Sequence, residues 1–255
     1  MRKQIWSPFQ GTPGLANNSR KWLVVLACYL LIIGVWVCPI RAYAANTGYP
    51  HMAPLSQYMS ESVSDEIALA RSAAPASISD HAEILTLGRH GYHIAIKGSN
   101  GFVCLVERSW AKKFDNAGFW NPIMRAPLCL NPAAMRSVET VYLKRTTWVL
   151  AGMTRVEMRK RTVAAIAAKE ITVPETGAMS YMMSKDQNLV NGLKGDLGTH
   201  WYPHLMFYYS NTQLPKWGAN LRDVPVFSIS ANPLTTIFLV LVPRWSDGTP
   251  SPADK

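Results

Sequence analysis

Apolar residues recur along this chain with two different periods, which predicts a mixture of helices and strands. The first clear pattern after residue 58 has helical spacing and is formed by Met59, Val63, Ile67 and Ala70. It predicts one helix that ends before Pro75. Residues 45–58 precede this helix and contain Gly, Pro and Ala, so we predict that they form a flexible N-terminal arm.

From residue 82 onward, short apolar runs are separated by turn residues, which is typical of β structure. These runs predict strands over residues 84–87, 92–97 and 102–107. Turn residues at 88–91 separate the first two strands, and Gly98-Ser99-Asn100-Gly101 separates the last two. Because an Asn-Gly step favours the positive φ angles of a tight hairpin turn, we predict three antiparallel strands in sequence.

Helical signals return at residue 131, where Asn131 and Pro132 suit the N-cap and the first residue of a helix. The stretch 139–150 is rich in β-branched residues but long enough for a helix, and we assign it to one. Thr154 and Glu157 have the spacing of a capping box at the start of a further helix. The apolar residues predicted to form the buried face of that helix are Val156, Val163, Ile166 and Ala167.

The last third of the chain has strand character over residues 178–184, 204–209, 224–230 and 236–242. Residues 109–130 have no clean period and are predicted to be an irregular loop held by aromatic packing. The elements do not alternate strictly between strand and helix, which favours the α+β class. We therefore predict a mostly antiparallel sheet with two to four helices in a single compact domain over residues 59–248, and a disordered tail over residues 249–255.

Residues 1–44 have the pattern of a signal peptide. Their first 21 residues carry four cations and no acidic residue, an uncharged run follows over residues 22–40, and Ala42 and Ala44 supply the small residues of a cleavage site. We predict cleavage after Ala44 and a periplasmic or secreted protein. The alternative is that residues 22–40 anchor the chain, because 19 residues at about 1.5 Å each nearly span the ~30 Å hydrocarbon core. In both cases residues 45–255 lie outside the cytoplasm.

Removal of this leader changes the charge balance. Five of the 26 Lys and Arg residues precede residue 45, so 21 basic and 16 acidic residues remain and the formal charge falls from +10 to +5. This ordinary value removes the main support for a nucleic-acid partner. The run Arg159-Lys160-Arg161 lies in a helical pattern, where successive side chains diverge by about 100°, and indicates a solvated helix face. We expect no nucleic-acid partner, and membrane contact only through an uncleaved leader.

Cys28 and Cys38 belong to the leader, so the exported domain retains Cys104 and Cys129. In an oxidising compartment an even pair predicts a disulfide, which would stabilise a loop of this length by about 3 kcal/mol. Two alternatives are a pair of buried free thiols and a catalytic thiol. The second is disfavoured because Cys104 lies in an apolar strand-like run, where burial raises the pKa of a thiol.

Residues 200–204 form the most suggestive polar group of the chain. His200 and His204 could share a helix face and bind zinc, but Pro203 disfavours a continuous helix and Trp201 occupies the position of the glutamate in a zincin motif. In an extended strand the two Cα atoms would be about 13 Å apart. We predict no metal site and no cofactor. The candidate ligand-binding residues are His200, Trp201, His204 and Tyr208.

Strand alternation after Pro203 predicts which side chains share a face. Leu205, Phe207 and Tyr209 should face one side, and His204, Met206 and Tyr208 the other. His204 should then border an aromatic surface and serve in ligand contact or packing.

Five segments of this chain resemble those of a functionally uncharacterised family of exported bacterial proteins. They are Gly98–Cys104, Tyr181–Lys185, His200–Tyr208, Trp217–Asn220 and Trp245–Thr249. The resemblance implies export, and it implies no activity, cofactor or catalytic residue. Our leading hypothesis is a non-catalytic binding or structural module. The alternative is a secreted hydrolase whose site contains His200 or His204 and polar loop residues.

Overall fold

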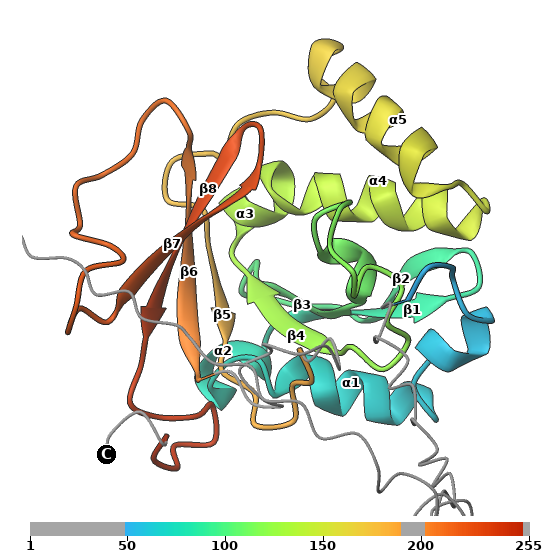
Figure 1. Cartoon of the computed structure of the whole chain (residues 1–255). Coiled ribbons are helices and arrows are strands. Elements are labelled where there is room, and N and C mark those ends of the chain that lie inside the picture. Colours follow the sequence, from blue (N-terminus) through green and yellow to red (C-terminus); the bar gives the residue numbers. More distant parts are fainter. Residues whose placement is uncertain (1–48, 190–201, 252–255) are drawn as a thin grey trace, which may run out of the picture. The chain divides into compact units, whose positions relative to one another are not determined.

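An eight-stranded sheet organises the part of the chain that the computed structural model describes, residues 49–189 and 202–251 (Figure 1). Its strands are β1 (Glu83–Gly88), β2 (Gly91–Ile96), β3 (Val103–Glu107), β4 (Ala126–Leu130), β5 (Met179–Met182), β6 (His204–Ser210), β7 (Val226–Asn232) and β8 (Thr235–Leu241). They lie in the order β2-β1-β3-β4-β5-β6-β8-β7. Every neighbouring pair is antiparallel except β1 and β3.

Five α-helices accompany the sheet within these residues. They are α1 (Val63–Arg71), α2 (Ala76–Ser79), α3 (Pro132–Ser137), α4 (Glu139–Leu150) and α5 (Arg155–Ala167), with two short 3₁₀ helices, η1 (Leu55–Tyr58) and η2 (Ser109–Ala111). The predicted class, α+β with a mostly antiparallel sheet in one compact domain, is confirmed. The helix beyond the predicted number is α2, which forms a single turn.

The starts of α3 and α5 follow from their caps. The side chain of Asn131 accepts a hydrogen bond from the backbone N–H of Ala134 at 2.9 Å, which satisfies one of the free donors at the start of α3. Thr154 and Glu157 form the complete capping box of α5. Both sequence predictions are confirmed, since these signals depend only on residues within one helical turn.

The predicted buried face of α5 is wrong. Val156 and Val163 are 64 % and 61 % exposed, and the helix instead buries Met158, Thr162 and Ala165. The helix presents a different side to the protein from the one that its apolar residues indicate. Two large apolar side chains are therefore left at the surface.

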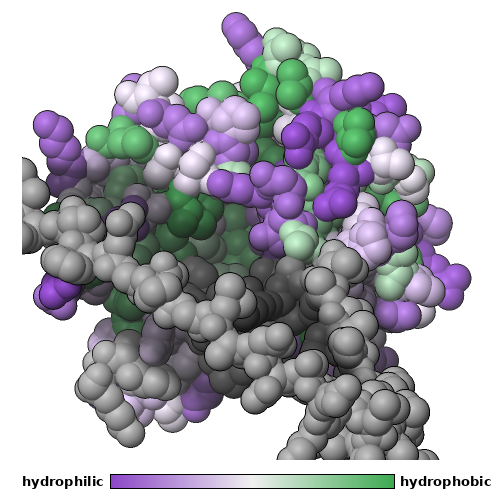
Figure 2. Space-filling view, viewed as in Figure 1, coloured by the Kyte–Doolittle hydropathy of each residue, from purple (hydrophilic) through white to green (hydrophobic). Residues whose placement is uncertain are grey.

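Helices cover the first half of the sheet on both faces. In Figure 1, α1 lies against one face of β1, β3 and β4, and α4 lies on the other side. Alternation along β3 supplies both layers, because Leu105 packs in the core beneath α4 whereas Cys104 packs against Ala70 of α1. Figure 2 shows a hollow on one face of the molecule that is lined largely by hydrophobic residues.

The connection from β2 to β3 differs from the predicted hairpin. Although β1 and β2 form the expected hairpin around Gly88 and Gly91, β3 pairs with β1 in parallel, on the side away from β2. The chain crosses the start of β1, where Ser99 N–H donates to the carbonyl of His81 at 2.8 Å. A Cβ atom on Gly98 would lie 2.2 Å from the backbone nitrogen of Glu83, so only glycine fits this crossing.

Strand β4 lies within residues 109–130, where the sequence predicts an irregular loop. It contains Pro127, and proline cannot donate a ladder hydrogen bond inside a sheet. The structure accommodates it because β5 pairs only with Cys129 and Leu130, so β5 does not reach Pro127. Cys129 lies directly opposite Cys104 on β3, with the sulfur atoms at bonding distance, as predicted.

Both ends of the described domain extend beyond the predicted limits. The predicted arm over residues 45–58 includes Tyr58, which is fully buried and donates a hydrogen bond to the carbonyl of Trp120 at 2.8 Å. In the predicted tail, Ser251 is buried and its N–H donates to the carbonyl of Pro243 at 2.8 Å. Residues 49–58 and 249–251 therefore belong to the folded domain.

No helix within the described ranges is both long enough and apolar enough to span a membrane. The predicted signal peptide, its small residues Ala42 and Ala44, and the alternative anchor over residues 22–40 all lie outside those ranges.

Candidate functional site

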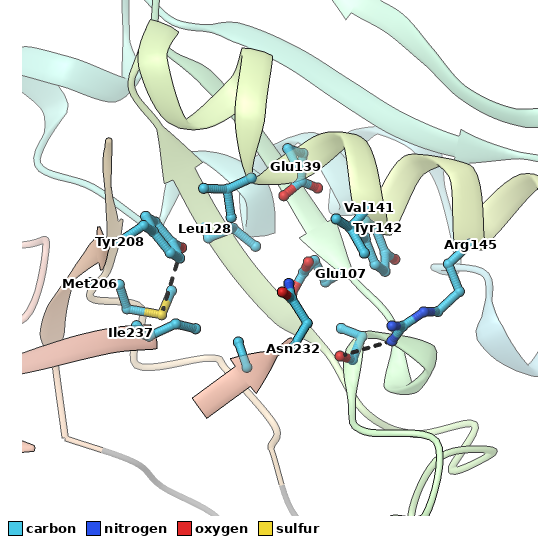
Figure 3. A pocket seen from close by; sticks show the side chains of 13 residues that line it. Glu107, Leu128, Glu139, Val141, Tyr142, Arg145, Met206, Tyr208, Asn232 and Ile237 are labelled. Atoms are coloured by element: carbon cyan, nitrogen blue, oxygen red, sulfur yellow. Dashed lines mark hydrogen bonds between the residues drawn. The ribbon is translucent and has the colours of Figure 1, made fainter. Parts of the chain in front are cut away.

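A small cavity of about 130 Å³ lies between the N-terminal half of α4 and the sheet (Figure 3). Residues of β3, α4, β6, β7 and β8 line it. We call it the carboxylate pocket, and its polar wall consists of Glu107, Glu139, Tyr142, Arg145, Tyr208 and Asn232. Strands and helices rather than long loops supply most of these side chains, which gives the site a rigid frame.

Strand alternation brings Glu107 into the pocket. Val103, Leu105 and Glu107 share one face of β3, and the first two are part of the core beneath α4. Glu107 ends this apolar row and lines the cavity. Glu139 reaches the same cavity as the first residue of α4, immediately after α3 ends.

The two carboxylates line one cavity, in surroundings that oppose ionisation. Glu139 is only 2 % exposed, and its Oε1 atom has no hydrogen-bond partner. Burial raises the pKa of Glu139 well above its ordinary value, and the charge of Glu107 raises it further. Burial likewise raises the pKa of Glu107 to about 7, although Arg145 acts in the opposite direction. The pair therefore tends to retain a proton near neutral pH.

Arg145 holds a positive charge at the rim of this pocket. Its Nη1 donates hydrogen bonds to the carbonyls of Trp110 and Lys112 at 2.7 and 2.9 Å, beside the end of η2. Its guanidinium carbon also lies 4.3 Å from the centre of the Phe114 ring. Burial lowers the pKa of Arg145 to about 10, and Glu107 partly offsets this, so the side chain stays charged at neutral pH.

Tyr142 contributes a phenol whose proton is already engaged. The backbone N–H of Arg108 donates to its oxygen at 2.8 Å, and the neighbouring Tyr92 donates its own proton to the carbonyl of Val106 at 2.5 Å. The 2.8 Å bond between the two phenol oxygens must then be donated by Tyr142. Burial raises the pKa of both tyrosines, so both remain neutral. Tyr142 shapes the pocket but offers it no free donor.

The structure describes two of the four predicted ligand-binding residues, and only one of these lines the carboxylate pocket. Tyr208 lines the carboxylate pocket, where its hydroxyl bonds to Ser180 at 2.7 Å. His204 begins β6, is 1 % exposed, and its Nδ1 lies 2.8 Å from the carbonyl of Tyr202. Burial lowers the pKa of His204, which favours the neutral ring. His200 and Trp201 lie outside the described residues.

The predicted alternation along β6 is present. His204, Met206 and Tyr208 are buried, and the opposite face of the strand carries an aromatic cluster. That cluster consists of Phe207, Tyr209, Trp217 and Phe238. His204 and the aromatic cluster thus belong to opposite faces of the strand. Within the described ranges, no three His, Cys, Asp or Glu side chains gather in a way that could hold a metal ion.

Sequence reasoning did not single out Glu107 or Glu139. The sequence does contain a signal for Glu107. This residue occupies the next alternate position after Val103 and Leu105, so strand alternation directs it to the same buried face. No such signal marks Glu139, because acidic residues in a first helical turn are usual and interact favourably with the helix dipole. Its burial depends on how α4 lies against the sheet.

Comparisons of this chain with protein-family models, curated proteins and solved structures find no match. The resemblance to a family of exported bacterial proteins therefore stays a prediction.

Proposed function

We propose that residues 45–255 form an exported, non-catalytic binding module that takes a small organic cation in the carboxylate pocket. The observation that carries this proposal is the buried, unpartnered Oε1 of Glu139, which shares a cavity with Glu107. A buried acceptor without a donor costs free energy, and a ligand N–H would supply the donor.

Charge balance favours a cation over a neutral ligand. Two carboxylates and one guanidinium line the pocket, so full ionisation leaves one uncompensated negative charge. A proton can neutralise this charge, which is consistent with the raised pKa values of Glu107 and Glu139. An alkylammonium group would replace that proton and add hydrogen bonds to ionised acceptors, which are stronger than bonds between neutral groups.

The size and lining of the pocket support binding over catalysis. A cavity of about 130 Å³ admits only a few non-hydrogen atoms, since a cavity of about 150 Å³ holds benzene. Its lining contains no Ser, Thr, Cys, His or Lys, so glutamates and tyrosines are its only side chains of the kinds that act as nucleophiles. The alternative of a hydrolase centred on His204 gains no support from this pocket, because His204 is buried and does not line it.

The experiment is a calorimetric titration of the domain with n-butylamine, with n-butanol as the neutral probe of similar shape. We expect n-butylamine to bind at pH 8 and more weakly at pH 5.5, because protons then compete for the carboxylates. Glu139→Gln should weaken binding at least roughly tenfold, since it removes a charge-assisted bond. The exposed Glu61→Gln is the matched control and should have no effect. Equal binding of n-butanol, or unchanged affinity in Glu139→Gln, would refute the proposal.

A further inference from the structure

A second, wider cavity adjoins the carboxylate pocket. Its volume is about 490 Å³, and it lies between α5, the loop after η2 and the turn that joins β7 to β8. Arg145, Ala231 and Asn232 line both cavities, so the two adjoin at these residues. We call the wider cavity the outer recess.

The outer recess has the opposite charge to the pocket. Lys113, Arg145 and Arg159 line it with one acidic residue, Asp115. Among the described residues neither Lys113 nor Arg159 forms an ion pair. Both cations are therefore available to an anionic group. A ligand that extends from the carboxylate pocket would pass from a negative site to a positive one.

The Phe114 ring contacts two of the cations that line the recess, Arg145 of α4 and Arg159 of α5. The guanidinium carbons of Arg145 and Arg159 lie 4.3 and 5.8 Å from the centre of its ring. Arg159 is exposed to solvent, and its contact with Phe114 places it beside the same ring as Arg145. Arg159, Lys160 and Arg161 are exposed on α5, as the sequence predicts, and Arg159 also lies near the Phe114 ring.

The wall between the charged ends is largely apolar. Val163 and Ile166 of α5 line it on one side, and Pro233 on the other. Val163 is 61 % exposed, which is unusual for a residue that the apolar pattern assigns to the core. A short hydrocarbon chain in the recess would cover these side chains and remove apolar area from water.

We infer that the ligand is a zwitterion, an ω-amino carboxylic acid whose ammonium group enters the carboxylate pocket and whose carboxylate meets Arg159 and Lys113 across an apolar spacer. This inference rests on the proposed function, because the carboxylate pocket must first accept the ammonium group. It adds the second charge and the spacer as determinants of specificity.

The test compares pairs of probes that have the same chain length with and without a carboxylate. Calorimetric titrations would use n-butylamine against γ-aminobutyrate, and n-hexylamine against ε-aminocaproate. At one of these lengths we expect the amino acid to bind roughly threefold to tenfold more tightly, as an added ion pair at a partly exposed site allows. The advantage should shrink in concentrated salt, which screens the outer cations.

The variant Arg159→Gln should abolish the advantage of the amino acid and leave the affinity for the plain amine unchanged. Arg161→Gln is the matched control, because Arg161 is exposed on the same helix and does not line the recess. If amines bind through Glu139 but the carboxylate brings no advantage at either length, the zwitterion inference is overturned and the proposed function stands. If no amine binds, the proposed function itself fails.

Discussion

Arg108 and Glu66 form a buried ion pair that joins the end of β3 to α1. The Nη2 atom of Arg108 lies 2.8 and 2.7 Å from the two carboxylate oxygens of Glu66, and the side chains are 0 % and 4 % exposed. The Nε atom of Arg108 also donates to the carbonyl of Tyr58 at 2.6 Å. The preceding residue, Glu107, lines the carboxylate pocket beside α4, whereas Arg108 pairs with Glu66 of α1. The first remains available to a ligand and the second is fully paired.

Loss of Arg108 should be strongly destabilising. Arg108→Met keeps much of the apolar volume but leaves the carboxylate of Glu66 buried without its cation. We expect the free energy of unfolding to fall by about 3–5 kcal/mol. Urea unfolding followed by tryptophan fluorescence would measure the change.

Two further variants separate this effect from a general loss of charge. Lys144→Met removes one partner of the exposed Lys144–Glu170 pair and should cost less than about 1 kcal/mol. Adding Glu66→Leu to Arg108→Met should recover part of the loss, because the unpaired charge is then gone. Equal effects of Arg108→Met and Lys144→Met would show that the buried pair has no special role.

Local signals in the sequence predict local structure well in this protein. The Asn131 cap, the capping box of Thr154 and Glu157, and the β1–β2 hairpin depend on neighbouring residues, and the structure contains all three. Strand alternation likewise predicts that Tyr208 shares a face with His204 and Met206. The structure buries that face, and Tyr208 lines the carboxylate pocket. Periodicity therefore recovers one residue of the candidate site.

The remaining features depend on contacts between distant segments. The parallel pairing of β3 with β1 is invisible to turn propensity, because Asn100-Gly101 suits a hairpin and a crossing equally well. Glu139 is buried because α4 packs against the sheet, and the residues in its own helical turn do not predict that burial. Which face of α5 is buried also depends on tertiary contacts, which cover Thr162 and leave Val163 exposed.

The crossing at Gly98 gives a direct test of this topology. Gly98→Ala would place a methyl group 2.2 Å from the backbone nitrogen of Glu83, so backbone must shift. We expect a loss of about 2–4 kcal/mol in the free energy of unfolding, as for other severe steric conflicts. Ser99→Ala at the adjacent exposed position should change it by less than about 0.5 kcal/mol. A hairpin between β2 and β3 would tolerate both substitutions alike.

The cysteine pair should be oxidised in protein recovered from its natural compartment. Cys104 and Cys129 are 25 residues apart and lie opposite each other on β3 and β4. Intact mass with and without reduction and alkylation should show two thiols only after reduction. Replacing both by Ala should cost about 3 kcal/mol of stability. Two thiols that react in unreduced, denatured protein would contradict the disulfide.

Export should leave a shortened chain. If signal peptidase cuts after Ala44, protein from the periplasm or the medium begins at Ala45, and amino-terminal sequencing would detect it. The basic start, the uncharged run and the small residues at the cleavage site motivate this expectation. A chain that still begins at Met1 and is extracted only with detergent would instead establish residues 22–40 as a membrane anchor.

The carboxylate pair should make stability depend on pH in a defined direction. In the folded protein burial raises the pKa of Glu107 from about 4.5 to about 7, so folding favours its protonated form. This contribution is fully present below the unfolded pKa and is lost as the pH rises through the folded pKa, between about pH 4.5 and pH 7. Glu107→Gln should therefore gain roughly 1–3 kcal/mol relative to the original protein when the pH is raised from 5 to 8.

The measurement is the difference in unfolding free energy between Glu107→Gln and the original protein, taken at several pH values, which cancels the titration of most other groups. Glu61→Gln is again the control, and its difference should stay flat because Glu61 is exposed. A flat difference for Glu107→Gln as well would mean that Glu107 ionises as it does in water. The pocket would then not oppose a second negative charge, and its preference for a cation would lose this electrostatic basis.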